Sequence, residues 1–559
     1  MLPLRPLFLL LAWLLLNLLQ AALTPLDPDE TYYWMYAGQL DWGYFDHPPA
    51  VALLIALGRD WLPGSLGLRL GHVLCSTGLL VAMYYLLDRP AGRWLLLATA
   101  LLLAQPMLQV YGFIATPDGP LLLATALYLL AYRRFLRQPT VAVGCVWGLT
   151  MALLLYSKYH GVVLIFFSVL PQLAYLLRQP GAWVAAGSGL LLFLPHLYWQ
   201  YSNDYPSFRY HLSGRDDPYQ LKYTLQYLGN QLLIFSPFLL YYYVRTFTHD
   251  RAHDRFERAC RWLVAGVLLF FLYTTTKGGT EAQWTALLSI PLVYLTYRAL
   301  RRYPAWAPGL RRMAYLTIGL LLVARLLLLL PREWLPFEKP FDHAPWVRRL
   351  AERVGDRPVV IENSYRLASL YSFYSGGQPA WTFTDVEYRP SQYDLWQQDT
   401  IWHGQPVYVL GQVNWTAAGS SPFRTQKRDM RLKRVENFQV PKGTELAVTS
   451  PLPERANPGK DIPLRLEATA PRNLYLRGPL PLDLYAILKY PDGRQAFWRL
   501  QPLEDSLLSA GTAEVYRGKL HLPEDLSPGV VELSFGLGYR GMPPLRGQSS
   551  TYPLRISGE

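Results

Sequence analysis

The chain has 559 residues, of which 51% are apolar and only 17% are charged. This charged share is below the roughly 25% of soluble domains, so the composition predicts a membrane part joined to a soluble part. The formal net charge of +13 does not predict nucleic-acid binding, because most arginines stand in short loops between apolar runs. The cysteines, Cys75, Cys145 and Cys260, lie in or beside such runs, which excludes a disulfide framework and a cysteine metal site.

Apolar runs of membrane length dominate the first 330 residues. Residues 7–23 predict an uncleaved anchor helix rather than a cleaved signal peptide. Ten later runs have about the length of a membrane span. They cover residues 66–87, 94–113, 117–132, 140–157, 160–177, 182–199, 226–244, 262–276, 281–299 and 313–330. The chain is therefore predicted to be a polytopic α-helical membrane protein with about eleven transmembrane helices.

The distribution of lysine and arginine predicts the orientation of these helices. With the N-terminus in the cytoplasm, the cytoplasmic loops hold seventeen of these residues and the opposite loops hold seven. Positive charge gathers in cytoplasmic loops, so this excess supports a cytoplasmic N-terminus. With eleven spans, the C-terminal region is then extracytoplasmic. We expect a multi-pass protein of the bacterial inner membrane.

The pattern becomes that of a soluble protein after Pro331. We predict a transmembrane domain at residues 1–335, a small α/β domain at 336–442 and a β-sandwich at 443–559. The α/β domain is indicated by the amphipathic helix APWVRRLAERVG and the buried strands PVVIEN and QPVYVLG. The sandwich is indicated by short alternating strands, such as LDLYAILKYPDGRQAFWRL, which is predicted to turn at its Pro-Asp-Gly.

Acidic and basic side chains collect in the loops that are predicted to be extracytoplasmic. The first of these loops, residues 27–49, reads DPDETYYWMYAGQLDWGYFDHPP and directly follows the first span. The candidate site residues in this and the later loops are Asp29, Glu30, Tyr44, Asp46, Asp118, Lys158, His211, Arg215, Lys277 and Glu281. Ionisable groups at a membrane are costly and usually functional, so their gathering on one face predicts a site.

Each of these residues also has a structural explanation when it is taken alone. Asp118 suits a helix cap, Lys158 suits a lysine that reaches the membrane interface, and His211 suits a structural loop histidine. The aromatic residues of the first loop suit an interfacial belt. The joint pattern favours function, because one face collects acids and bases whereas the other has mainly arginine.

The inventory of side chains suits transfer of a sugar from a lipid carrier. Lys158, Arg215 or Lys277 would stabilise the anionic phosphate that leaves a polyprenyl-phosphate sugar. Asp29 would act as the base for an acceptor hydroxyl. A divalent ion held by carboxylate and imidazole could neutralise the departing phosphate. Aromatic rings such as Tyr44 offer faces on which a sugar ring can stack, and Glu281 is a further candidate for substrate binding.

Several motifs resemble those of a known enzyme family. DPDETYYW followed by GYFDHPP is similar to the first-loop signature of the GT-C membrane glycosyltransferases. The resemblance is closest to the branch of the protein O-mannosyltransferases and the lipid A aminoarabinose transferase. TPDGPLLL, SKYHGVVL, GGTEAQWTALLSIP and SYRLASLYSFYSGGQPAWTFTDVEYRPSQYDLW resemble further blocks of the bacterial family 39 members. The resemblance covers roughly residues 1 to 400 and leaves out the C-terminal sandwich.

The resemblance implies roles for individual residues. Asp29 would be the principal catalytic carboxylate with Glu30 beside it, and Asp118 would be a second acid of the pocket. Lys158 would contact lipid phosphate. Asp46 and His211 would hold a metal ion, whose identity as Mg²⁺, Mn²⁺ or Zn²⁺ stays open. His47 departs from the aminoarabinose enzyme, which has a lysine there, and this weakens a specific expectation of aminoarabinose.

These observations predict an inverting glycosyltransferase in the membrane. Its partners would be a polyprenyl-phosphate-linked sugar donor, membrane lipid and an extracytoplasmic acceptor, with lipid A, a glycan and a protein left open. Two alternatives are a transporter or flippase for polyprenyl-linked sugars and a non-catalytic protein that binds lipid-linked glycan. Transporters usually place polar groups at mid-membrane and show repeated halves, and neither feature is evident here.

Overall fold

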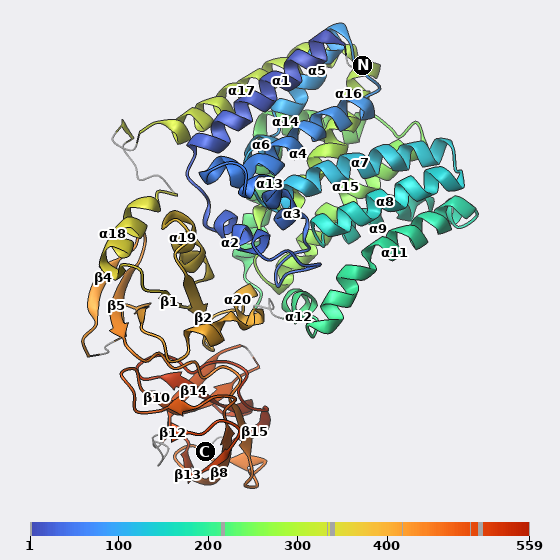
Figure 1. Ribbon diagram of the computed structural model, residues 1–559. Coiled ribbons are helices and arrows are strands. Elements are labelled where there is room, and N and C mark those ends of the chain that lie inside the picture. The colour runs from blue at the N-terminus through green and yellow to red at the C-terminus, as the bar shows by residue number, and fades with distance from the viewer. Residues whose placement is uncertain are drawn as a thin grey trace. The chain divides into compact units, whose positions relative to one another are not determined.

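The computed structural model describes residues 3–213, 218–331, 334–335, 341–415, 418–491, 493–500 and 507–557. The chain divides into two compact units, Met1–Phe341 and Asp342–Glu559 (Figure 1). Helices make up the first unit, and strands with a few helices make up the second. The finer division of the second unit at residue 442 stays a prediction.

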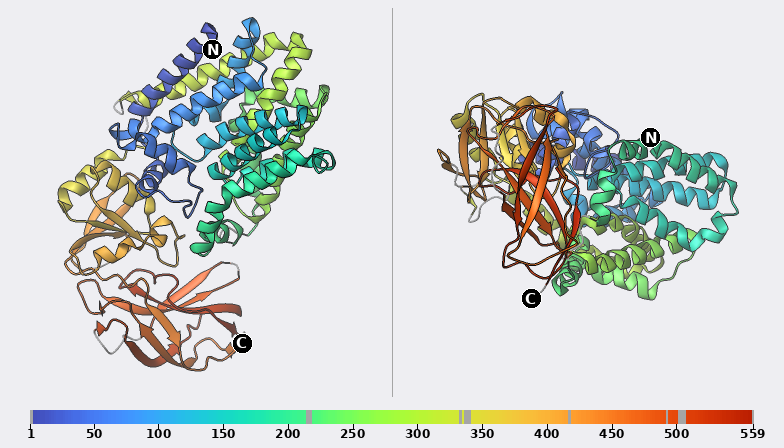
Figure 2. Two further views of the ribbon diagram at one scale, coloured as in Figure 1. Left: turned by 45° about the vertical axis from the view of Figure 1, so that its right-hand side comes forward. Right: turned by 90° about the horizontal axis from the view of Figure 1, so that it is seen from below.

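The first unit is a bundle of helices, seen from two further sides in Figure 2. Its α-helices are α1 (Leu4–Leu23), α2 (Pro28–Ala37), α3 (Ala50–Arg59), α4 (Gly64–Leu86), α5 (Gly92–Leu103), α6 (Pro106–Val110), α7 (Asp118–Arg137), α8 (Val141–Ser157), α9 (Gly161–Val169), α10 (Leu173–Leu176), α11 (Pro180–Ser202), α12 (Pro206–Ser213), α13 (Leu221–Phe235), α14 (Pro237–His249), α15 (Arg255–Thr274), α16 (Ser289–Arg302) and α17 (Ala307–Leu329). Short 3₁₀ segments follow α9 and α15 and precede α16 and α17.

Every predicted span contains helix, but two of them are interrupted. The span predicted at 94–113 is divided between α5 and α6, and the one at 226–244 is divided at Ser236, whose φ is +62°. Among the described residues, five helices are long and apolar enough to cross a membrane: Leu4–Leu23, Gly64–Leu86, Pro180–Ser202, Arg255–Lys277 and Pro304–Leu329. The chain is a multi-pass membrane protein, whereas the count of eleven helices stays a prediction.

Small residues bring α8 and α11 into close contact. A Cβ atom on Gly148 would lie 2.5 Å from the backbone oxygen of Ala185, and one on Gly144 would overlap the backbone of Gly181. Glycine on one helix therefore lets the two backbones approach, as is common between membrane helices. Because α8 ends at Ser157, this packing also places the loop that carries Lys158.

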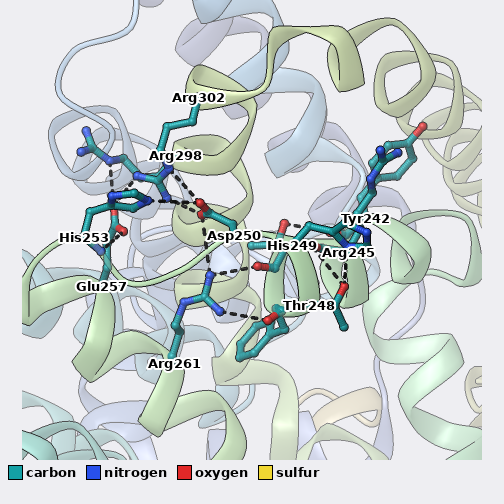
Figure 3. Close-up of polar contacts among 12 residues, drawn as sticks. Tyr242, Arg245, Thr248, His249, Asp250, His253, Glu257, Arg261, Arg298 and Arg302 are labelled. Atoms are coloured by element: carbon teal, nitrogen blue, oxygen red, sulfur yellow. Dashed lines mark hydrogen bonds and ion pairs between the residues drawn. The ribbon is translucent and has the colours of Figure 1, made fainter.

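Two buried acids, Asp250 and Glu257, pair with arginines near the start of α15 and the end of α16. Figure 3 shows Asp250 and Glu257 facing Arg261, Arg298 and Arg302. Glu257 Oε1 accepts hydrogen bonds from Arg298 Nε at 3.1 Å and from Arg302 Nη1 at 2.8 Å. This cluster lies at the start of α15, whereas the loop with the predicted site residues Lys277 and Glu281 follows the end of α15. The paired arginines and the candidate site are thus at opposite ends of one helix.

The second unit contains a mixed sheet in the order β2-β1-β3-β5-β4. β1 (Val359–Glu362) pairs in parallel with β2 (Ala380–Phe383) and β3 (Val407–Gln412), and β5 (Asp429–Val435) pairs antiparallel with β3 and with β4 (Ser421–Arg424). The helices of this part are α18 (Ala344–Val354), α19 (Tyr365–Tyr374) and α20 (Gln392–Leu395). The predicted amphipathic helix and both predicted buried strands are confirmed as α18, β1 and β3.

The remaining strands form three sheets in the region where we predicted a β-sandwich. Their orders are β11-β10-β14-β15-β7, β13-β8-β6 and β12-β9. The strands are β6 (Glu445–Val448), β7 (Arg455–Ala456), β8 (Asp461–Thr469), β9 (Leu474–Tyr475), β10 (Leu482–Lys489), β11 (Gln495–Arg499), β12 (Leu507–Leu508), β13 (Ala513–His521), β14 (Gly529–Tyr539) and β15 (Tyr552–Ile556). The predicted hairpin is the antiparallel pair β10 and β11.

One hydrophobic core extends from the mixed sheet into the other sheets. Val360 and Val409 belong to the same buried cluster as Leu466, Leu484 and Phe535. Backbone contacts reinforce this continuity, since the Val386 N–H donates to the Pro544 carbonyl at 2.9 Å. Removal of the strands after residue 442 would therefore expose the core of the mixed sheet as well.

Two buried carboxyl groups stand at the ends of β1 and β2. Burial raises the pKa of Glu362 to about 7 and that of Asp385 to about 6. The Asp385 carboxylate raises the pKa of Glu362 further, and the Glu387 carboxylate raises both pKa values. Glu362 Oε2 accepts the Gln412 N–H at 2.7 Å, and the Asn363 amide donates to Asp385 at 2.7 Å. The folded state thus binds protons more tightly than the unfolded state does.

These raised pKa values predict a pH-dependent stability. Between the unfolded pKa of Glu362, about 4.5, and its folded pKa, about 7, the folded state holds more protons, so stability falls as pH rises. We expect Glu362→Gln, which keeps the oxygen that accepts from Gln412, to raise the thermal midpoint at about pH 8, by an amount corresponding to roughly 2–3 kcal/mol. The gain should shrink toward about pH 5. A constant difference at all pH values, or an equal gain with the exposed Glu445→Gln, would contradict this prediction.

Candidate active site

The first loop begins with helix α2, whose first turn is capped by its own residues. Asp27 is the N-cap of α2, and its Oδ1 accepts the Asp29 N–H at 2.8 Å. Pro28 occupies the first helical position, where its missing N–H costs nothing. Glu30 completes a capping box by accepting the Asp27 N–H at 2.9 Å. Asp29 is therefore held in the first turn of α2, where its side chain is half-buried.

Glu30 forms a buried ion pair with Arg69 of α4. Arg69 Nε donates to Glu30 Oε1 at 2.7 Å and Arg69 Nη2 donates to Glu30 Oε2 at 2.5 Å, and the two side chains are 1% and 0% exposed. Arg69 also donates to the carbonyls of Ala21 and Thr24 at the end of α1, and the Ala115 N–H donates to Glu30 Oε1 at 2.7 Å. The pair thus joins α1, α2, α4 and the loop before α7.

This arrangement does not fit the catalytic role that we predicted for Glu30. Both carboxylate oxygens already accept hydrogen bonds, from Arg69, Asp27 and Ala115, and the side chain is fully buried. A base must reach the proton that it takes, which Glu30 cannot do in this position. We therefore interpret Glu30 as a positioning residue that holds the neighbouring Asp29.

A second ion pair links two later loops. Lys158, at the end of α8, donates to Asp118 Oδ1 at 2.8 Å, at the start of α7. Both side chains are 6% exposed. Asp118 lies three residues after Ala115, whose N–H donates to Glu30. The Glu30–Arg69 pair and the Asp118–Lys158 pair therefore both contact the segment that leads into α7. An ammonium group has three donors, and Asp118 takes one of them in this contact.

Asp46 lies in a tyrosine-lined position near the Lys158 loop. Its Oδ2 accepts hydrogen bonds from the Tyr32 hydroxyl at 2.9 Å and from the Tyr36 hydroxyl at 3.2 Å. His211 Nε2 lies 3.3 Å from the Asp46 backbone oxygen, and the rings of His211 and Tyr159 are 5.6 Å apart. Burial raises the pKa of Tyr159, and the nearby Asp46 carboxylate raises it further. Asp46, His211 and the Lys158 loop are therefore neighbours.

Tyr111 lies among carboxylates from three segments. The buried Tyr111 side chain interacts electrostatically with Asp118, Asp27 and Glu281. Such interactions act over short distances, so the loop after α15 also approaches the Asp118 loop. Lys277 lies in the same loop as Glu281, and its side chain is exposed. Arg215 lies outside the described residues.

Tyr44 does not fit the substrate contact that we predicted for it. Its side chain is 0% exposed, and its ring stacks on that of Tyr36 with centroids 4.1 Å apart. Its hydroxyl donates to the carbonyls of Tyr36 and Gln39. No face of this ring is open to a sugar, and the residue instead closes the first loop around Asp46.

The described residues do not form a metal centre. In that part of the chain, no three His, Cys, Asp or Glu side chains are grouped so that they could hold a metal ion. His211 Nε2 lies 3.3 Å from the Asp46 backbone oxygen, to which a protonated nitrogen would donate a hydrogen bond. The metal role of Asp46 and His211 stays a prediction.

Two contributors to this region were not recognised in the sequence. Arg69 and Tyr111 lie in or at the end of predicted membrane spans, at 66–87 and 94–113. A signal for Arg69 was present, because a charged residue inside an apolar run is costly and needs a partner. No comparable signal marks Tyr111, whose sequence neighbours are those of many interfacial tyrosines.

Comparisons with known proteins identify similar sequences and similar folds. Residues 46–199 match the family model of the dolichyl-phosphate-mannose-protein mannosyltransferases. The lipid A galacturonosyltransferase RgtD of Rhizobium johnstonii is 25% identical over 455 residues, which cover 74% of this chain and 90% of RgtD. The crystal structures of ArnT from Cupriavidus metallidurans, in the apo state and bound to undecaprenyl phosphate, have TM-scores of 0.58 and 0.57. Each is 16% identical and covers 76% of this chain and 97% of ArnT.

These findings define the class of protein. The fold is that of the GT-C membrane glycosyltransferases, and residues 46–199 match a mannosyltransferase family model. Among the proteins of this class it is similar to ArnT and to RgtD. The resemblance that we inferred from the loop motifs is confirmed.

Proposed function

We propose that this protein transfers a sugar from a polyprenyl-phosphate donor to an envelope glycolipid of the lipid A type, on the extracytoplasmic side of the inner membrane. The observations that support the proposal are two contacts. Glu30, next to Asp29, accepts the N–H of Ala115, three residues before Asp118, and Asp118 pairs with Lys158. Similarity to a lipid A galacturonosyltransferase supports the acceptor class, and similarity to a structure with undecaprenyl phosphate supports the donor class.

The reaction would be a single displacement with inversion at the anomeric carbon. Asp29 accepts the proton of the acceptor hydroxyl, and the acceptor oxygen bonds to the anomeric carbon. The bond from that carbon to the phosphate oxygen breaks, and its electron pair stays on the polyprenyl phosphate. Lys158 stabilises the charge of this leaving group with the donors that Asp118 does not occupy. Asp118 holds the ammonium group in place.

Mass spectrometry of envelope lipids tests the proposed function. We expect cells that produce the protein to contain a glycolipid heavier by one sugar residue, and cells with Asp29→Asn to lack it. Purified protein with a polyprenyl-phosphate sugar and the unmodified glycolipid should form the same product and release polyprenyl phosphate. If cells with and without the active protein had identical glycolipids but differed in a glycosylated protein or soluble glycan, the proposed acceptor class would be wrong. The proposal that the protein is a glycosyltransferase would still stand.

Replacement of Lys158 tests its contact with the donor phosphate. We expect Lys158→Met to lower kcat/KM for the polyprenyl-phosphate sugar by about 100-fold or more, because a cation that stabilises the leaving group is lost. The single variant also leaves Asp118 buried without a partner, which lowers the thermal midpoint. Initial rates and thermal unfolding of the purified protein measure the two effects.

A double variant separates these two effects. Asp118→Asn combined with Lys158→Met removes both charges, so we expect the thermal midpoint to recover toward that of the wild type. The transfer rate should stay low, because the leaving group still lacks its cation. Recovery of the rate together with the midpoint would mean that Lys158 is only a structural partner of Asp118.

A further inference from the structure

A cavity of about 290 Å³ lies within the second unit. Its walls come from the mixed sheet and its following loops and from the segments around residues 438–443 and 545–548. Both sides belong to one compact unit with a shared core. The cavity is therefore built into a rigid part of the chain, and its volume is close to the lower limit of about 300 Å³ for small-molecule sites.

Aromatic side chains form much of the wall of this cavity. They are Trp381, Phe383, Tyr393, Trp402, Phe438 and Tyr539. Several pack on each other, as Trp381 does on Tyr393 with ring centroids 5.0 Å apart. The wall thus presents flat apolar faces that are held in place. Aromatic faces suit the apolar C–H faces of a sugar ring, which needs polar partners only around its edge.

The polar groups of the wall include a buried carboxylate with few partners. Asp399 is 5% exposed, and its nearest cation is Lys442 Nζ at 3.6 Å. The structure gives Asp399 no hydrogen bond among the described residues, whereas the Asp394 carboxylate accepts from Ser391 and Thr384. A buried carboxylate gains from hydroxyl donors. The Trp402 Nε1 atom is also shielded from solvent without a partner among the described residues, so it can donate to a ligand oxygen.

The balance of charge favours a neutral ligand. The wall contains two acids, Asp394 and Asp399, and two bases, Lys442 and Arg546. The Arg546 guanidinium already donates to the backbone carbonyls of Asp385, Val386 and Tyr388. The remaining pair, Asp399 and Lys442, offers one acceptor and one donor group. A phosphate or a uronate would face Asp399 without an unoccupied arginine.

We propose that this cavity is a second carbohydrate site, which binds a neutral saccharide residue against its aromatic walls with hydroxyl groups bonded to Asp399, Lys442 and Trp402. This proposal does not depend on the proposed transfer reaction. A chain with such a site could hold a sugar of a glycosylated acceptor independently of the donor.

Saturation-transfer NMR on the full-length protein in detergent tests this site. The probes are the methyl glycosides of mannose, galactose and N-acetylglucosamine at about 10 mM, a concentration that detects weak binding. We expect saturation of at least one glycoside by the wild type, and a loss of about tenfold in affinity with Asp399→Asn and with Trp402→Phe. Trp498→Phe is the matched control, since Trp498 also has a shielded Nε1 atom but does not line the cavity.

Two further results decide the proposal. Asp29→Asn, which disables the proposed transfer site, should leave the glycoside signals unchanged, so that failure of transfer and failure of this site are distinguishable. Thermal midpoints of the two cavity variants should match that of Trp498→Phe, which excludes unfolding as the cause. The proposal is overturned if none of the three glycosides receives saturation, or if Asp29→Asn abolishes the signals while Asp399→Asn and Trp402→Phe keep them.

Discussion

Asp29→Asn is expected to lower the rate of sugar transfer by about 10³-fold, because general-base catalysis typically contributes 10²–10⁴-fold. The amide of asparagine cannot accept the hydroxyl proton at neutral pH, while its size is nearly that of the carboxylate. The Asp29 side chain is half-buried. Because asparagine has nearly the same size and shape, we expect the thermal midpoint to stay close to that of the wild type. Initial rates with a polyprenyl-phosphate sugar measure the effect.

The control for this variant is Asp60→Asn, at the end of α3. The Asp60 side chain is 84% exposed, and its only charged contact among the described residues is with Arg59 at 3.9 Å. We expect this variant to transfer sugar at the wild-type rate. If Asp29→Asn kept its activity within a few-fold, Asp29 would not be the base. If it also kept the movement of lipid-linked sugar across the membrane, the transporter alternative would gain support.

Glu30→Gln is expected to destabilise the first unit strongly. It removes one charge of a pair whose side chains are 0% and 1% exposed, and it leaves Arg69 as an uncompensated buried cation. Breaking a buried ion pair in this way typically costs about 3–5 kcal/mol. The Ala115 N–H and the Asp27 N–H also lose a charged acceptor. Thermal unfolding in detergent should show a midpoint lowered by several degrees.

The same variant distinguishes positioning from direct catalysis. If Glu30 acts by holding Asp29, the double variant Glu30→Gln with Arg69→Met should regain part of both the thermal midpoint and the transfer rate, because no buried charge is left unpaired. If Glu30 were itself the base, the double variant would regain stability but stay inactive. Asp204→Asn provides the control, since Asp204 pairs with Arg209 on the surface, with side chains 71% and 65% exposed, and such pairs contribute little.

Much of the architecture follows directly from the order of the residues. Apolar runs must leave water, so helices occur at each predicted span. The change of composition after Pro331 comes shortly before the boundary between the two units at Phe341. The cap at Asp27 and Pro28, the helix of residues 344–354 and the β10–β11 hairpin also depend on near neighbours. Local rules are reliable in such cases because every interacting group lies within a few residues.

The sequence predicted which loops form the candidate site, but it did not predict the function of each residue in them. Asp29 and Glu30 are adjacent acids in the sequence, yet one is half-buried at a helix start and the other is paired with Arg69, 39 residues away. Tyr44 resembles other loop aromatics, but packing against Tyr36 closes it off. Side-chain type therefore indicated where the chemistry is, whereas contacts distant in the sequence determine which groups remain available to a substrate.

The sequence by itself determined that this is a multi-pass membrane protein with the motifs of a GT-C glycosyltransferase, because hydrophobic partition and loop composition depend on residue identity alone. Only the tertiary structure decided which charges neutralise each other. Glu30 meets Ala115 across 85 residues and Lys158 meets Asp118 across 40, and the cavity of the second unit needs walls from both sides of residue 442. Pairing and cavities depend on the path of the whole chain, since they arise where distant segments pack together.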